Sequence, residues 1–129
     1  MAKNTTRQGA NFELDVMHAL EEQGYTCLRS SGSRGAVDVV AVAPRGWYSP
    51  RESASLLFIQ CKIKNPVISP AERMAIQDLA LRAGADPLVA FKAKDETTGR
   101  ITVKLRRLTG PGPKDWEPWP WAPGKDNRS

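Results

Sequence analysis

The chain of 129 residues carries a formal net charge of +5, and its length suits one domain with a buried hydrophobic core. No apolar run approaches the ~20 residues that a membrane-spanning helix needs, and the opening residues lack the apolar stretch of a signal peptide. We therefore expect no membrane partner and a cytoplasmic location, in a host cytoplasm if a phage encodes the chain. The moderate positive charge permits a nucleic-acid partner but does not establish one.

Hydrophobic periodicity predicts two helices and five strands, which indicate an α/β fold with a mixed five-stranded β-sheet flanked by helices. Two of the strands contain the cysteines, Cys27 and Cys61. Buried, reduced thiols are the favoured interpretation, and a disulfide or a metal-binding pair is the alternative. The expected strands are 25–29, 36–42, 56–63, 88–92 and 101–108.

The first helix is expected at 8–23, after a frayed stretch at 1–6, and Gly24 follows it as a residue suited to end a helix. Glu13 falls at the flank of the apolar stripe, where a carboxylate faces the sheet on which the helix packs. From this position alone, Glu13 is either a functional carboxylate or an edge residue whose stem lies along the apolar surface. The core-facing stripe consists of Phe12, Val16, Ala19 and Leu20.

A capping box predicts the start of the second helix, expected at 70–83. Ser69 and Glu72 have the spacing for reciprocal hydrogen bonds, and Pro70 occupies the first helical position. Gly84 is expected to end this helix. One predicted apolar face consists of Ile76, Leu79, Ala80 and Ala83. A smaller patch of Met74 and Leu81 lies opposite, and either meets another chain or is a pair of scattered surface residues.

The segment from Gly110 is rich in proline and glycine and is expected to form neither a strand nor a helix. We therefore divide the chain into a folded domain at 1–109 and a Pro/Trp-rich C-terminal tail at 110–129. The tail carries Trp116, Trp119 and Trp121, which indicate that it packs on the domain or on a partner. A long polar loop is expected at 44–55, where Trp47 and Tyr48 either contact a ligand or pin the loop to the domain.

Two predicted strands carry polar side chains at their centres, where a buried charge costs several kcal/mol unless it is paired or binds a metal. Asp38 lies in one of these strands, and Gln60 and Lys62 lie in the next. Because side chains alternate along a strand, Gln60 and Lys62 share one face. The simplest explanation is that these three polar side chains belong to one site.

The pattern is the one that a metal-dependent phosphodiesterase requires. Hard divalent ions take oxygen ligands, which are available from the Asp38 carboxylate, the Gln60 amide and the backbone carbonyl of Cys61. Lys62 would then orient or deprotonate the attacking water, or neutralise the charge that builds on phosphorus. Glu13 would complete the site from the first helix.

Four stretches of the chain resemble the archaeal-type Holliday junction resolvases (Hjc), which are small dimeric members of the PD-(D/E)xK nuclease superfamily. They run from Arg7 to Glu13, Gly24 to Ser33, Val37 to Ala41 and Ile59 to Lys62. The resemblance spans about residues 7–92 in the same order. It implies a restriction-endonuclease-like core and Mg²⁺-dependent cleavage of four-way DNA junctions, with Mn²⁺ as a substitute. It also implies a homodimer with two active sites that makes paired nicks.

The resemblance also assigns roles to individual residues. It implies a catalytic set of Glu13, Asp38, Gln60 and Lys62, and metal ligands from Glu13, Asp38, Gln60 and the backbone carbonyl of Cys61. Guanidinium groups suit phosphate because they bind it through paired hydrogen bonds. Taken alone, Arg29 would be a surface salt-bridge residue and Ser33 an ordinary turn residue. The implied DNA-binding residues are Arg7, Arg29, Ser30, Ser33, Arg34 and Lys64.

The chain departs from the family pattern at several places. Gln60 stands where the family usually has Glu, which keeps an oxygen ligand but removes a negative charge, so the affinity for metal should fall. Leu14 stands where arginine is frequent, the loop at 44–55 is longer, and the tail is not shared. Two alternatives stay open: another nuclease of the superfamily, restriction-like or repair-like, and a junction-binding module that cleaves weakly because of Gln60.

Overall fold

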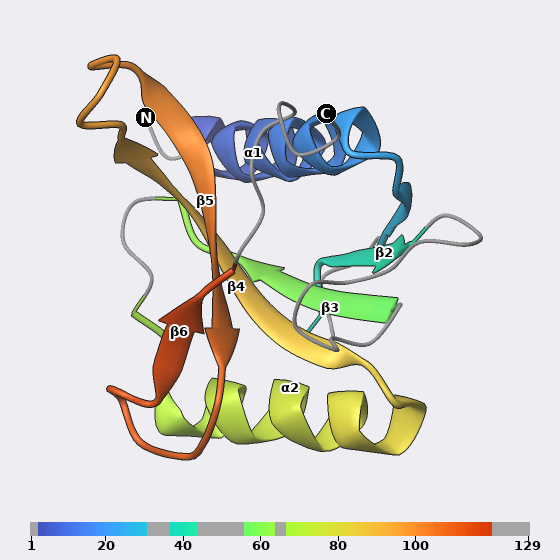
Figure 1. The fold of residues 1–129 in the computed structure, drawn as a ribbon. Coiled ribbons are helices and arrows are strands. Elements are labelled where there is room, and N and C mark those ends of the chain that lie inside the picture. The colour runs from blue at the N-terminus through green and yellow to red at the C-terminus, as the bar shows by residue number, and fades with distance from the viewer. Residues whose placement is uncertain (1–2, 31–36, 44–55, 64–66, 120–129) are drawn as a thin grey trace.

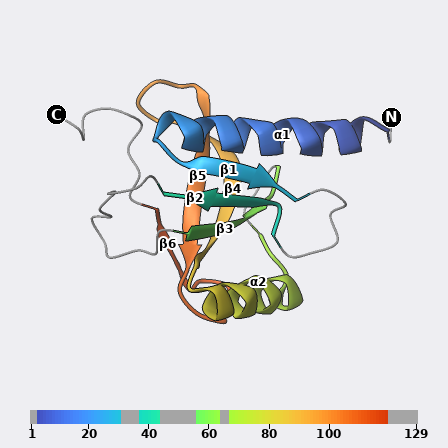
Figure 2. The same cartoon turned by 90° about the vertical axis from the view of Figure 1, so that its right-hand side faces the viewer.

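The structure is a computed structural model that describes residues 3–30, 37–43, 56–63 and 67–119. A six-stranded mixed sheet lies between two helices (Figure 1), so the predicted α/β fold with flanking helices is confirmed. Helix α1 (Lys3–Glu22) covers one face of the sheet and α2 (Pro70–Ala83) covers the other, as Figure 2 shows. The strands, in their order across the sheet, are β1 (Thr26–Arg29), β2 (Val39–Val42), β3 (Leu56–Cys61), β4 (Asp86–Lys94), β5 (Ile101–Leu108) and β6 (Trp116–Pro118).

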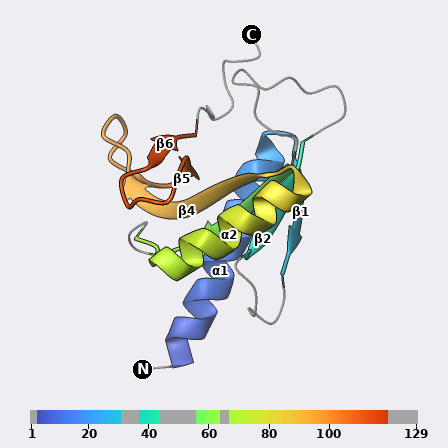
Figure 3. The same cartoon turned by 90° about the horizontal axis from the view of Figure 1, so that it is seen from below.

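The β3–β4 pair is parallel, and the other neighbouring strands pair antiparallel. A parallel pair needs a long crossover connection, and α2 provides it by running across the sheet (Figure 3). The carboxyl ends of β3 and β4 consequently lie at the same edge of the sheet. In Figures 1 and 2, the amino end of α1 and the first turn of α2 lie on that side as well.

Alternating side chains of β3 supply both faces of the sheet. Leu57 and Ile59 are fully buried in the cluster under α1, together with Phe12, Val16 and Leu20. Phe58 packs instead against the cluster under α2, which contains Ile76 and Val89. The predicted alternation of β3 is therefore confirmed, and its centre is anchored from both sides, which holds the polar residues at its carboxyl end in place.

The sixth strand corrects the prediction that the segment from Gly110 forms neither a strand nor a helix. Trp116 and Pro118 belong to β6, which pairs antiparallel with the end of β5. Proline is tolerated here because an edge strand leaves one side of its backbone unpaired. The Trp116 ring lies 3.6 Å from the Arg106 guanidinium, and Trp119 is buried in the cluster under α1. These two tryptophans pack on the domain; Trp121 lies outside the described residues.

The ends of the helices agree with the sequence at three of four places. Gly24 and Gly84 follow α1 and α2 with φ of 98° and 72°, a region that favours glycine. The capping box of α2 is present, with both reciprocal hydrogen bonds between Ser69 and Glu72. The amino end of α1 differs, because the helix begins at Lys3 and not at residue 8. No proline interrupts the first ten residues, so the helix extends through the stretch expected to fray.

The buried face of α2 is rotated from its predicted position. Ile76 and Ala80 are buried as expected, but Leu79 is 40% exposed and Ala83 is exposed. Arg73 is buried instead, because its Nη1 donates hydrogen bonds to the carbonyls of Gly110 (3.0 Å) and Asp115 (3.2 Å). The turn before β6 therefore covers this side of α2. In the described part of the chain, no helix has the length and apolar character to cross a membrane.

Candidate active site

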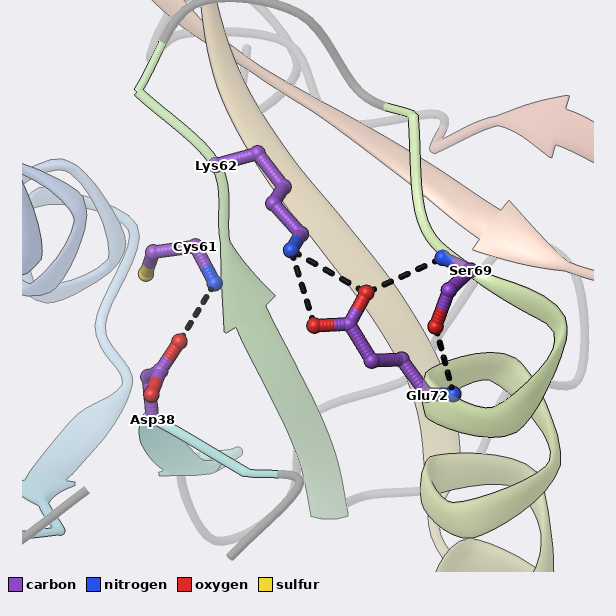
Figure 4. Close-up of polar contacts among 5 residues, drawn as sticks. All are labelled: Asp38, Cys61, Lys62, Ser69 and Glu72. Atoms are coloured by element: carbon purple, nitrogen blue, oxygen red, sulfur yellow. Dashed lines mark hydrogen bonds and ion pairs between the residues drawn. The ribbon is translucent and has the colours of Figure 1, made fainter. Parts of the chain in front are cut away.

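Asp38 lies at the entrance of β2 and not within the strand, which corrects its predicted position. Its N–H donates to the Ile59 carbonyl at 2.8 Å, and its Oδ2 accepts from the N–H of Cys61 at 2.8 Å. The side chain thereby takes the place of the next backbone contact between β2 and β3 (Figure 4).

The Asp38 carboxylate is held in a partly buried place that disfavours its charge. Burial raises its pKa, the Cys61 N–H and the nearby Lys62 oppose that rise, and the charge of Glu72 adds to it. A carboxylate in this situation carries an unrelieved electrostatic cost when it is ionised. A cation bound beside Asp38 would remove that cost.

Glu13 brings a second carboxylate from α1 toward the same place. Its side chain is 20% exposed, and its Oε1 lies 3.3 Å from Nε of Arg29. Burial raises the pKa of Glu13, the charge of Asp38 raises it further, and Arg29 opposes the rise. A carboxylate whose ionisation is opposed by burial and by a neighbouring carboxylate forms a site at which a divalent cation is favoured.

Gln60 contributes an amide whose oxygen is unsatisfied. The residue is 9% exposed, and its Oε1 is buried with no hydrogen-bond partner among the described residues. A buried acceptor left in this state costs about 1–3 kcal/mol. Because carboxylate, amide and carbonyl oxygens are the ligands of Mg²⁺ and Mn²⁺, the side chains present fit such an ion. No group of three His, Cys, Asp or Glu side chains suited to a metal occurs among the described residues.

The cysteine side chains do not add to this set. Cys27 and Cys61 are both free. Burial raises the pKa of Cys27 to about 11 and also raises the pKa of Cys61. Both thiols are therefore protonated at neutral pH, whereas a thiol must be ionised to bind a metal. Neither sulfur is therefore suited to bind a metal, and the predicted ligand from Cys61 is its backbone carbonyl.

Lys62 follows β3 directly and turns toward α2. Its Nζ lies 3.0 Å from Oε2 and 3.2 Å from Oε1 of Glu72, and Figure 4 shows the side chain directed at that carboxylate and away from Asp38. The N–H of Ser69 lowers the pKa of Glu72 first, and Lys62 lowers it further. The sequence predicted only a capping role for Glu72. A glutamate three positions after Ser69 is fully explained by the capping box, so nothing in the sequence pointed to its contact with Lys62.

The candidate DNA-binding residues are only partly described. Arg29 is 37% exposed beside Glu13, and Ser30 is exposed and donates its N–H to the Asp38 carbonyl at 2.9 Å. Arg7 lies in α1, but its side chain is outside the description. Ser33, Arg34 and Lys64, and also Trp47 and Tyr48 with their loop, lie outside the described residues. Two predicted contacts thus flank the carboxylates, at the carboxyl end of β1.

Comparisons with known proteins agree with this geometry. The model of the family described as archaeal Holliday junction resolvase (Hjc) matches residues 4–109. Among solved structures, Archaeoglobus fulgidus Hjc, a Holliday junction resolvase from an archaeal hyperthermophile, shares 22% sequence identity at a TM-score of 0.55. That match covers 74% of this chain and 72% of the other, and it shows that the fold is shared. No curated protein matches the chain. The chain belongs to the archaeal Holliday junction resolvase family.

Proposed function

We propose that this protein is a metal-dependent endonuclease that resolves four-way DNA junctions, and that a homodimer makes the paired nicks. Membership of the resolvase family supports the substrate and the class of reaction. The observation that carries the chemistry is the approach of Glu13 and Asp38, two carboxylates from different elements, in which the charge of Asp38 raises the pKa of Glu13. Such a pair is stabilised by a divalent cation.

The residues that would hold Mg²⁺, with Mn²⁺ as a substitute, are Glu13, Asp38, Gln60 and Cys61 through its carbonyl. When bound, the ion supplies Lewis-acid activation of the scissile phosphate. The protein contributes a preformed frame for it, because the Cys61 N–H already fixes one Asp38 oxygen. The Gln60 oxygen would gain the partner that it lacks.

Two cationic side chains near the carboxylates, Lys62 and Arg29, would bind the phosphate and neutralise its charge. Lys62 emerges from the end of β3 and would neutralise the charge that builds on phosphorus during in-line attack by water. Arg29 is accessible enough to bind a non-bridging phosphate oxygen through its guanidinium. Arg29 would then exchange its contact with Glu13 for one with DNA. We expect the cleavage to leave a 5′-phosphate on the product strand.

A homodimer would place two such sites on one junction. The surface of α2 opposite Ile76 supports this assembly, because Met74 and Leu81 are 70% and 81% exposed. A groove of about 450 Å³ runs beside them, lined in part by Pro70, Gln77 and Pro111. Exposed large apolar side chains around a groove are typical of a surface that another chain covers.

A second candidate function follows from Gln60. An amide in place of a carboxylate lowers the negative charge available to a cation, so the protein would bind junctions and cleave them weakly. The short chain shows few elements suited to reading bases, which favours recognition of DNA shape over sequence in either case.

The deciding experiment incubates the protein with Mg²⁺ and either a four-way junction or a linear duplex of matched sequence, beside Asp38→Ala and Gln60→Glu. Symmetric nicks in the junction alone, lost in Asp38→Ala, support resolution. Equal cutting of the linear duplex assigns the protein to another nuclease function. Cleavage that occurs only in Gln60→Glu identifies a binding module.

A further inference from the structure

We infer that Glu72 is a positioning residue for the reaction, which holds the Lys62 side chain on the α2 side of the candidate site. This inference rests on the proposed function, because it concerns the lysine that would act on the phosphate. Glu72 lies outside the four residues predicted to be catalytic. It belongs to a different element from each of them, since it is in the first turn of α2.

The geometry of the pair is that of a two-point contact. Nζ of Lys62 is within hydrogen-bonding distance of both Glu72 oxygens, at 3.0 and 3.2 Å. A lysine carries a long flexible stem, so an acceptor that is itself immobile is needed to keep its ammonium in one place. With both oxygens engaged by one ammonium, the side chain of Lys62 has a single direction, toward α2 (Figure 4).

Glu72 is itself held by the start of the helix. Its Oε1 accepts from the N–H of Ser69 at 2.9 Å, and its own N–H donates to Oγ of Ser69 at 3.1 Å. The two contacts of Oε1 therefore join the helix cap and the lysine in one chain of hydrogen bonds. The contact with Ser69 and the contact with Lys62 both lower the pKa of Glu72, which keeps it ionised and able to retain the ammonium.

The same carboxylate adds negative charge near the site. Its charge contributes to the raised pKa of Asp38, so the two are close enough to interact electrostatically. In a site with Gln60 where a carboxylate is usual, Glu72 keeps Lys62 from forming a direct ion pair with Asp38. Asp38 is then left available to a cation, and Lys62 is left at the flank where phosphate would lie.

Two variants separate this role from helix capping. Glu72→Gln keeps the acceptor for the Ser69 N–H, since glutamine also forms a capping box, but it places an NH₂ group against the ammonium. Ser69→Ala removes the Oγ contact while its backbone N–H still binds Glu72. The first variant therefore breaks the pair with Lys62 and the second weakens the cap.

The readout that does not depend on cleavage is the rate at which an acylating reagent modifies Lys62, measured by mass spectrometry against the exposed Lys94 of the same molecule. The reagent must reach Nζ of Lys62, and both oxygens of Glu72 lie against that atom. We expect Glu72→Gln to raise the relative rate at Lys62 several-fold and Ser69→Ala to leave it unchanged. An unchanged rate in Glu72→Gln overturns the inference, whether or not the protein cuts DNA.

Junction cleavage provides the second readout. Loss of a group that orients a catalytic side chain costs roughly 10- to 100-fold in activity, so kcat of Glu72→Gln should fall by about that factor at an unchanged KM. Equal losses in Ser69→Ala and Glu72→Gln would assign the effect to the helix start and reject positioning. If the unaltered protein cuts no junction, the proposed function fails, and the labelling rates alone decide whether Glu72 holds Lys62.

Discussion

The Asp38 carboxylate accepts a 2.8 Å hydrogen bond from the backbone N–H of Cys61, just beyond the last β2–β3 pair of Val39 and Ile59. A side chain thus completes the contact between two strands where their backbones separate. The bond orients Asp38 and also places the peptide of Cys61 next to it. The geometry of the candidate site and the end of the β2–β3 pairing consequently depend on the same atoms.

Replacing Asp38 with Asn should abolish cleavage and stabilise the free protein. Because the pKa of Asp38 is raised in the folded state, its ionisation favours the unfolded chain, and the free energy of unfolding falls as pH rises from the unfolded pKa through the folded one. Asn keeps an oxygen for the Cys61 N–H but carries no charge. We expect Asp38→Asn to be about 1 kcal/mol more stable at pH 8, with a smaller gain at pH 4, in urea unfolding. The exposed Asp78→Asn should show no such gain, and a less stable Asp38→Asn at pH 8 would contradict the assignment.

Gln60 should control the balance between stability and metal binding. Gln60→Glu adds a charge at a position that is 9% exposed, so without metal it should lose about 1–3 kcal/mol of stability. Because it adds a charged ligand, its affinity for Mg²⁺ should rise tenfold or more. Gln60→Met, of similar volume, removes the unsatisfied oxygen and should be at least as stable, with weakened Mg²⁺ binding. Thermal unfolding with EDTA and across a Mg²⁺ titration measures both effects, and equal Mg²⁺ affinity in all three proteins would exclude Gln60 as a ligand.

Arg29 should contribute to DNA binding in the absence of metal. Arg29→Gln removes one cation next to Glu13, so junction affinity should fall several-fold and the salt dependence of binding should weaken by about one counterion. Fluorescence anisotropy in EDTA at several salt concentrations measures this change. Arg82→Gln is the control, because Arg82 is 73% exposed on α2 and pairs with Asp78. An equal effect of the two variants would show that only net charge matters.

The exposed face of α2 should form the dimer contact. Leu81→Asp places a charge at the most exposed large apolar residue of that face, and burying it between two chains would cost several kcal/mol. Light scattering on a size-exclusion column should show a dimer for the unaltered protein and a monomer for Leu81→Asp. Ile101→Asp, also at an exposed apolar position but on β5, should remain dimeric. A dimer that survives Leu81→Asp would place the interface elsewhere.

Trp116 should stabilise the domain even though it lies after the segment that matches the family model. Its ring stacks on Arg106, which also lies 4.9 Å from the Phe91 ring. Trp116→Ala removes this contact and part of the packing of β6, so we expect a loss of about 2–4 kcal/mol in urea unfolding. Trp116→Phe keeps an aromatic face for the guanidinium and should lose less than half as much. A near-neutral Trp116→Ala would show that β6 does not support the fold.

Much of the fold could be predicted because its signals are local. The capping box of Ser69 and Glu72, the glycines after both helices, and the alternation of β3 depend on residues a few positions apart. The sixth strand could not be predicted in this way. Pro118 argues against a strand in isolation, and only pairing with β5 at the sheet edge makes its missing N–H harmless.

The sequence by itself determined the types of residue in the site and their placement along the chain: a helix carboxylate at Glu13, an acid at Asp38, and an amide and a lysine two apart at Gln60 and Lys62. Only the tertiary structure decided what each one faces. Three contacts join residues that are 10 to 23 positions apart. They are the ion pair of Arg29 with Glu13, the hydrogen bond from the Cys61 N–H to Asp38, and the two-point contact of Lys62 with Glu72. Such contacts depend on strand register and on how each helix crosses the sheet, which are set by packing of the whole domain and not by neighbouring residues.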